Sequence, residues 1–145
     1  MNKEQRDAIL FIFGSMEEIF GKTFIQKLFF VMEKEKQVSL NLFQYAPYNY
    51  GPFSKELSEA INELIDEGLI KETKVEDYYL YQITEKGKAE ARSQDTIPLK
   101  KQEVINQICQ YVKKFKIKDL IRYVYQKYPD TAVNSLLKKS DYSKY

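Results

Sequence analysis

Residues 48–87 constrain the fold of this chain more than any other segment. Residues 48–54 (YNYGPFS) combine glycine with proline and therefore exclude a helix. After them, apolar residues recur at the i, i+3, i+4, i+7, i+8 spacing of one helical face, namely Leu57, Ala60, Ile61, Leu64 and Ile65. Ser54 is the expected N-cap of this helix, and Gly68 is the expected left-handed residue after it.

Two strands are expected directly after this helix. Leu69–Thr73 and Tyr78–Ile83 are rich in aromatic and β-branched residues, with a turn at Glu76-Asp77 between them. Thr84, followed by an acidic residue, is expected to cap a further helix. This order of loop, helix, strand, turn, strand and helix start is the second half of a winged helix-turn-helix. We predict this fold, mainly α with a small β-hairpin wing.

The rest of the chain is expected to be helical apart from one strand. The expected elements are a helix over Asn2–Phe20, a helix over Phe24–Glu35 with a Thr23/Gln26 capping box, a strand over Leu40–Tyr45, helices over Leu99–Lys116 and Ile117–Tyr128, and a last short helix over Thr131–Lys139. Polar residues near 93–98 mark a boundary. We therefore predict a winged-helix domain, residues 1–97, and a basic helical C-terminal extension, residues 98–145, that packs on it.

The composition argues against an enzyme, a metal site and a membrane protein. The chain has no histidine and one cysteine, Cys109, so it lacks the commonest general base and the usual zinc ligands. Its five glycines are isolated and form no phosphate-binding loop. The apolar run Ala8–Phe13 is far shorter than the roughly 20 residues of a membrane span. We expect no catalytic, cofactor-binding or metal-binding residue, no membrane contact, and a location in the cytoplasm.

The helix over Ser54–Glu67 carries the wrong charge for DNA. In a winged helix-turn-helix this helix enters the major groove. Here it holds five acidic residues and one lysine. Carboxylates placed beside phosphates would oppose the counterion release that supplies most non-specific affinity for DNA. The charge therefore favours a protein partner.

Basic residues are concentrated towards the C-terminus instead. Residues 101–145 hold ten basic and four acidic side chains. The basic residues that could contact phosphate or an acidic protein are Lys113, Lys114, Lys116, Lys118, Arg122, Lys127, Lys138 and Lys139. A solvated lysine-rich surface explains them equally well. In the predicted wing, the charges of Lys71 and Lys74 are offset by neighbouring acidic residues.

Tyrosines form a second candidate for a binding surface. The chain has twelve tyrosines and no tryptophan. Those expected to converge where the loop before the acidic helix meets the wing are Tyr45, Tyr48, Tyr50, Tyr78, Tyr79 and Tyr81. Half-buried tyrosines are favoured in binding surfaces. Packing of the joint between helix and wing is an alternative of equal weight.

Three motifs in the first two thirds of the chain are similar to those of a known family. They are Gly21-Lys22-Thr23 with Gln26-Lys27-Leu28, Tyr48-x-Tyr50-Gly51-Pro52-Phe53-Ser54-x-x-Leu57, and Glu67-Gly68-Leu69-Ile70. Together they resemble the prokaryotic SocA-like antitoxin (Panacea) domain and its YwgA-type relatives. The resemblance covers residues 20–92 well and is looser beyond Pro98. It implies a domain that neutralises toxins by protein contact and not by catalysis.

We predict a non-enzymatic protein-interaction module whose partner, by this resemblance, is a toxin. The predicted partner-binding residues are Tyr48, Tyr50, Phe53, Glu56, Glu59, Glu63, Tyr79 and Tyr81. The alternative is a winged-helix DNA-binding transcriptional regulator that forms a homodimer through its C-terminal helices. Its predicted nucleic-acid contacts are Lys71, Lys74, Lys113, Lys114, Lys116 and Lys118.

Overall fold

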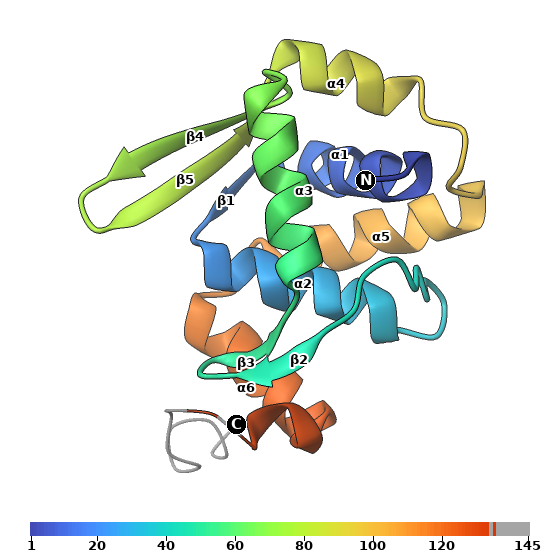
Figure 1. Ribbon diagram of the computed structural model, residues 1–145. Coiled ribbons are helices and arrows are strands. Elements are labelled where there is room, and N and C mark those ends of the chain that lie inside the picture. Colours follow the sequence, from blue (N-terminus) through green and yellow to red (C-terminus); the bar gives the residue numbers. More distant parts are fainter. Residues whose placement is uncertain (134, 136–145) are drawn as a thin grey trace.

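The computed structural model describes residues 1–133 and residue 135, and it is mainly helical with a small antiparallel sheet (Figure 1). In chain order the elements are α1 (Lys3–Met16), β1 (Glu18–Phe20), α2 (Lys22–Lys34), β2 (Ala46–Tyr48), β3 (Gly51–Phe53), α3 (Lys55–Asp66), β4 (Ile70–Val75), β5 (Tyr78–Ile83), α4 (Glu85–Arg92), α5 (Leu99–Val112), α6 (Ile117–Lys127) and the 3-10 helix η1 (Pro129–Ala132). The predicted class, mainly α with a small β wing, is confirmed. None of the helices in the described part has the length and apolar character to cross a membrane.

The helix and hairpin predicted from residues 54–84 form as expected. The Ser54 hydroxyl accepts a hydrogen bond from the N–H of Leu57 at 3.1 Å, which caps α3. Gly68 follows α3 with φ +77°. The β4–β5 hairpin turns after Glu76, whose φ of 56° is left-handed. Thr84 caps α4 by accepting from the N–H of Gly87 at 3.0 Å.

The predicted helix over Asn2–Phe20 is wrong in its last part. α1 ends at Met16, and Glu17 leaves the helix with φ 70°. Glu18–Phe20 then pairs antiparallel with β5, giving the sheet order β1-β5-β4. The main chain is extended here because it pairs with a strand whose residues lie 60 to 64 positions later in the chain, which no local apolar pattern signals.

The predicted Thr23/Gln26 capping box is also wrong. α2 begins at Lys22 with Gly21 as its N-cap, and no side chain caps it. Gly21 has φ 92°, a conformation that glycine adopts readily. The Gln26 amide bonds to the main chain of Ser54 instead.

Residues 40–45 form a loop and not the predicted strand. Side chains satisfy its main chain: the Glu33 carboxylate accepts from the N–H groups of Leu42 and Phe43 at 2.9–3.1 Å. The Gln5 amide donates to the Leu42 carbonyl at 2.9 Å. Bonded in this way, the loop needs no strand partner. The strand lies just after it, where β2 pairs with β3.

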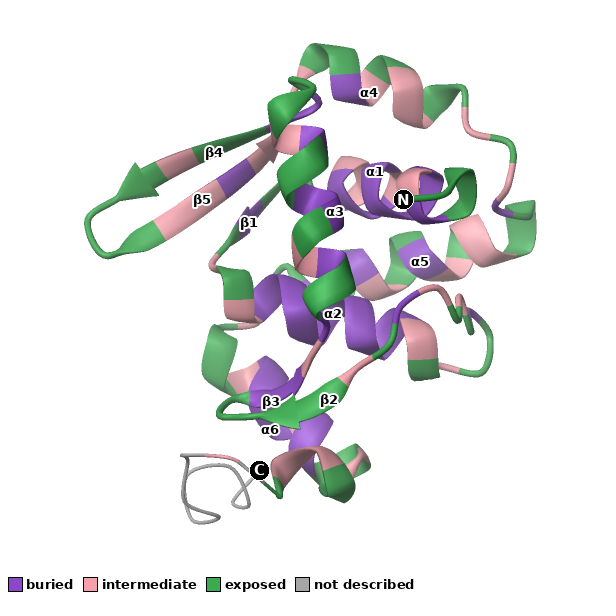
Figure 2. Ribbon diagram, viewed as in Figure 1, coloured by how far each residue is buried: buried purple, intermediate pink, exposed green. Residues whose placement is uncertain are grey.

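One buried cluster links the N-terminal and C-terminal helices (Figure 2). α1 and α2 supply much of it, and α5 and α6 add Ile105, Cys109, Leu120 and Val124, all fully buried. The division at residues 97/98 stays a prediction. Of the predicted last helix, η1 covers the start, and residues 134 and 136–139 lie outside the described residues.

Tyr45 offers a test of packing near the β2–β3 hairpin. Its ring packs edge-on against Phe30 with centroids 5.3 Å apart. Its hydroxyl is buried and forms no hydrogen bond with the described residues. A buried unsatisfied hydroxyl costs about 1–3 kcal/mol, so Tyr45→Phe is expected to raise the free energy of unfolding by about 1 kcal/mol. Urea unfolding checks this, and a loss of stability would contradict it.

Candidate functional site

The YGPFS segment lies where α2, β3 and α6 meet. Gly51 opens β3 with φ +100°. A Cβ atom added to Gly51 would lie 2.6 Å from Cε1 of Tyr125 in α6 and 3.1 Å from Cε of Lys27 in α2. Neither the conformation nor the space admits a larger residue without strain. This glycine therefore allows the hairpin to approach both helices.

Gln26 fastens the start of α3 to α2. Its side-chain oxygen accepts from the N–H of Ser54 at 2.7 Å, and its amide nitrogen donates to the Ser54 carbonyl at 3.0 Å. Both residues are buried. Two hydrogen bonds to one buried residue fix the position at which the helix begins.

Lys27 is the buried basic residue at the place where α2, β3 and α6 meet, which we call the α2–β3–α6 joint. Its side chain is 2% exposed, and its Nζ donates to the Pro52 carbonyl at 2.8 Å. It forms no ion pair with any described residue. Burial disfavours the charged form and lowers the pKa of Lys27 to about 7. The α2–β3–α6 joint thus holds an ionisable group that titrates near neutral pH.

The exposed side of α3 presents an acidic face. We use this name for Glu56, Glu59, Glu63 and Asp66, all of which are exposed. Their ion pairs are loose: the ammonium of Lys55 lies 3.9 Å from Glu59, and that of Met1 lies 3.9 Å from Glu63. Glu67, the C-cap residue of α3, is paired separately: Arg6 donates two hydrogen bonds of 2.9 Å to it and also bonds to Glu90.

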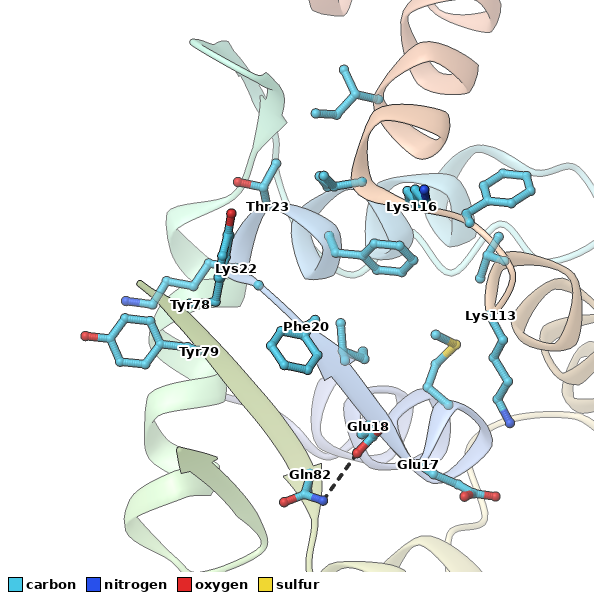
Figure 3. A pocket seen from close by; sticks show the side chains of 18 of the residues that line it. Glu17, Glu18, Phe20, Lys22, Thr23, Tyr78, Tyr79, Gln82, Lys113 and Lys116 are labelled. Atoms are coloured by element: carbon cyan, nitrogen blue, oxygen red, sulfur yellow. Dashed lines mark hydrogen bonds between the residues drawn. The ribbon is translucent and has the colours of Figure 1, made fainter. Parts of the chain in front are cut away.

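A groove of about 1340 Å³ lies between the β1–β5 side of the sheet and the connection from α5 to α6 (Figure 3). Phe20 and Tyr78 line it from the sheet, and Lys113 and Lys116 line it from the connection. The connection exists because α5 stops at Val112, before the predicted end at Lys116. Asp119 then caps α6 by accepting from the N–H of Lys116 at 2.9 Å.

The sequence of residues 24–129 matches the model of a protein family described as antitoxin SocA-like, Panacea domain. The chain belongs to this family. The match runs from α2 to the first residue of η1, so it extends beyond Pro98, where the sequence motifs alone resemble the family only loosely. Comparison with curated proteins and with solved structures found no match.

The Panacea domain brings only some of the tyrosines predicted to converge to one place: Tyr50, Tyr78 and Tyr79 line the groove, whereas Tyr45, Tyr48 and Tyr81 do not. Tyr48 and Tyr50 are exposed on the β2–β3 hairpin, and the Tyr48 ring packs edge-on against half-buried Phe53 at 5.1 Å. Tyr79 lines the groove together with Tyr50. The ammonium of Lys22 lies over the Tyr79 ring, 4.8 Å from the ring centroid. Tyr81 is only 2% exposed.

Tyr81 is therefore wrong as a partner anchor. It lies opposite Ile19 and Glu72 in the three-stranded sheet, and its ring belongs to the core. Side chains alternate between the two faces of a strand, so Tyr81 lies on the face covered by the helices. Tyr45 is likewise packed inward against Phe30.

The predicted lysine contacts fall into two separate groups. Lys71 and Lys74 are exposed on β4 of the wing. Lys113, Lys116 and Lys118 line the groove, whereas Lys114 is exposed outside it. Neither lysine of the wing lines the groove, and no residue of α3 lines it either.

Arg122 and Lys127 do not extend the free basic surface. Arg122 is 7% exposed and its Nη1 donates to Asp119 at 3.3 Å. Lys127 donates to the Glu35 carboxylate at 2.5 Å. Both side chains are therefore engaged with the body of the domain, and Lys138 and Lys139 lie outside the described residues.

The sequence patterns do not reveal the apolar part of the groove. Phe20 is 52% exposed and Ile117 is 37% exposed, although each adjoins buried residues. Phe20 belongs to a three-residue strand, too short for a recognisable alternation. Ile117 begins a helix and so looks like one more core position. Only the packing of α1 and α2 against β1 on one side and against α5 and α6 on the other brings Phe20 and Ile117 to one groove.

Proposed function

We propose that this Panacea domain is a non-enzymatic module of the prokaryotic cytoplasm that binds and neutralises a toxin protein through the acidic face of α3 and the β2–β3 hairpin. The observation that carries the proposal is the acidic face: of its four exposed carboxylates, two have no ion pair with a described residue, and the ion pairs of the other two are loose, at 3.9 Å. The exposed rings of Tyr48 and Tyr50 lie on the hairpin that leads into α3. Aromatic anchors beside a charged rim are typical of protein interfaces.

The chemistry of the chain supports a binding role over catalysis. It has no histidine to act as a general base. Burial raises the pKa of the Cys109 thiol to about 12, so the reactive thiolate is scarce at neutral pH. The exposed carboxylates of the acidic face of α3 are suited to pairing with basic side chains of a partner.

Charge reversal of the acidic face tests the proposal. Candidate toxins are co-expressed with the chain in a bacterial host, and rescue of growth identifies the partner. The variant Glu56→Lys/Glu59→Lys/Glu63→Lys is expected to weaken binding of that toxin by about two orders of magnitude, because like charges across an interface cost several kcal/mol. Isothermal titration calorimetry with purified proteins measures the change.

The matched control reverses three acids elsewhere. Glu4, Glu85 and Glu103 are exposed, and Glu4 and Glu85 lie in first helical turns as Glu56 does. The control variant, with all three changed to Lys, therefore has the same net charge and a similar effect on helix ends. The proposal would be refuted if neither the wild type nor the control variant rescued growth in the presence of any candidate toxin. It would also be refuted if the two triple variants bound the toxin with equal affinity.

DNA binding is the alternative, and the exposed lysines of the wing favour it. Lys71 and Lys74 are exposed on a hairpin that extends from the body of the domain (Figure 1). This alternative requires tight, salt-sensitive binding to a duplex. Fluorescence anisotropy with genomic duplexes at two salt concentrations distinguishes the two functions. Sequence-dependent binding that Lys71→Ala/Lys74→Ala weakens would support the alternative.

A further inference from the structure

β1 is an edge strand, and all three of its residues line the groove. The sheet order is β1-β5-β4, so β1 pairs on one side only. The N–H of Gly21 bonds to the Tyr79 carbonyl at 2.8 Å, and the N–H of Ile83 bonds to the Glu17 carbonyl at 3.3 Å. In an antiparallel pair, alternate residues direct their main-chain groups to opposite sides. The N–H and C=O groups of Glu18 and Phe20 therefore point away from β5.

The wall opposite β1 is basic. We call Lys113, Lys116 and Lys118 the lysine wall; all three are exposed and line the groove. None of them forms an ion pair within the described residues. Figure 3 shows Lys113 and Lys116 on the α5–α6 side and Phe20 on the strand that faces them. An occupant with carboxylates would neutralise this wall.

The size and apolar content of the groove suit an extended peptide. Its volume of about 1340 Å³ exceeds the roughly 300–1,000 Å³ of ordinary small-molecule pockets. The exposed apolar side chains of Phe20 and Ile117 offer contacts for alternate residues of a strand. A free strand edge beside side-chain pockets is the arrangement by which peptides are bound through strand addition.

We propose that the groove binds an acidic, extended segment of the partner protein as an additional strand on β1, with its carboxylates on the lysine wall. Main-chain hydrogen bonds to Glu18 and Phe20 supply register, and the lysines supply selectivity for acidic sequences. The inference rests on the proposed function, because it gives the partner a second contact surface, separate from the acidic face of α3.

A peptide is favoured over a nucleic acid at this site. The carboxylates of Glu17 and Glu18 and that of Asp77 also line the groove, on the side of the sheet and wing. A nucleic acid carries a phosphate on every nucleotide and would bring several of them near these acids. A strand instead alternates its side chains, so acidic residues can face the lysine wall while apolar ones face Phe20.

The test uses the full chain and fluorescein-labelled peptides. The acidic probe has the sequence EVDFEVE, and its basic counterpart is KVKFKVK. A third probe carries the acidic sequence with N-methyl groups at alternate residues, which removes the main-chain donors that would face β1. Fluorescence anisotropy measures affinity, and a ten-nucleotide oligothymidylate tests single-stranded DNA. The acidic probe is expected to bind about tenfold or more tightly than each of the others.

Four variants, two of them controls, locate the site. Lys113→Glu/Lys116→Glu/Lys118→Glu is expected to weaken the acidic probe by about tenfold or more, whereas Lys36→Glu/Lys74→Glu/Lys100→Glu, exposed lysines outside the groove, is expected to leave it nearly unchanged. Phe20→Pro removes the main-chain N–H of residue 20, which points away from β5, and therefore breaks no hydrogen bond within the sheet. Proline is tolerated at such a position of an edge strand. Phe20→Pro should weaken binding about threefold or more beyond Phe20→Ala, which removes only the ring. Circular dichroism verifies folding of each variant.

Hydrogen exchange gives a readout that side-chain contacts alone would not change. The acidic probe is expected to slow exchange at the amides of Glu18 and Phe20. Equal binding of the methylated probe, unchanged exchange, tighter binding of oligothymidylate, or no binding of the acidic probe would overturn the inference. The proposed function is tested separately by toxin neutralisation, which can succeed through α3 when the peptide fails to bind.

Discussion

Replacing Gly51 by alanine is expected to lower the free energy of unfolding by about 2–5 kcal/mol. Two costs combine. The φ of +100° is unfavourable for any residue with a Cβ atom, and that atom would lie 2.6 Å from the ring of Tyr125. The added clash cannot relax easily, because Tyr125 and Lys27, the two residues nearest to the added atom, are each only 2% exposed. Urea unfolding followed by circular dichroism measures the loss.

Gly68→Ala is the matched control for this prediction. Gly68 also has a positive φ, 77°, but nothing lies within 4 Å of the position of an added Cβ. Its substitution carries the conformational cost alone, about 1–2 kcal/mol. A loss at Gly51 no greater than the loss at Gly68 would show that the α2–β3–α6 joint yields to the extra atom.

Lys27→Met is expected to change how stability depends on pH. The pKa of Lys27 falls from its ordinary value of 10.5 to about 7 on folding, because burial disfavours the charge. Below pH 7 Lys27 is protonated in both the folded and the unfolded state, so the folded protein bears the full free-energy cost of burying the ammonium. Between pH 7 and 10.5 only the unfolded state keeps the proton, so the stability of the wild type rises relative to the variant.

The slope of this difference is up to about 1.4 kcal/mol per pH unit, or about 3–6 kcal/mol across the whole window. Unfolding curves of both proteins at several pH values from 5 to about 10 provide the measurement. Carbon-detected NMR of the Lys27 side chain reports its titration directly. Parallel stability curves, or a Lys27 titration near 10.5, would contradict the prediction.

Both predictions concern the family motif and explain its composition physically. Gln26 and Lys27 of α2 bond to the main chain of Ser54 and Pro52, and Gly51 provides the close approach. This joint determines where the β2–β3 hairpin and the first turn of α3 lie. Under the proposed function, a variant at the joint would displace Tyr48, Tyr50 and Glu56 together, although none of them is altered.

The amino-acid sequence alone determined the elements whose signals are local. The apolar spacing of α3, its Ser54 cap and Gly68, and the turn between β4 and β5 all depend on residues a few positions apart. The acidity of α3 and the lysines of residues 113–118 are likewise visible without a structure. The family resemblance rested on the same local motifs.

Only the tertiary structure decided which of these residues share a surface. The strand β1 exists because a distant hairpin offers it main-chain partners, and residues 40–45 remain a loop because Glu33 and Gln5 bond to their main chain. The same packing buries Tyr81 and brings Phe20 opposite Lys113 and Lys116. These contacts join residues far apart in the chain, and their energies depend on burial and hydrogen-bond geometry that no short stretch of sequence contains.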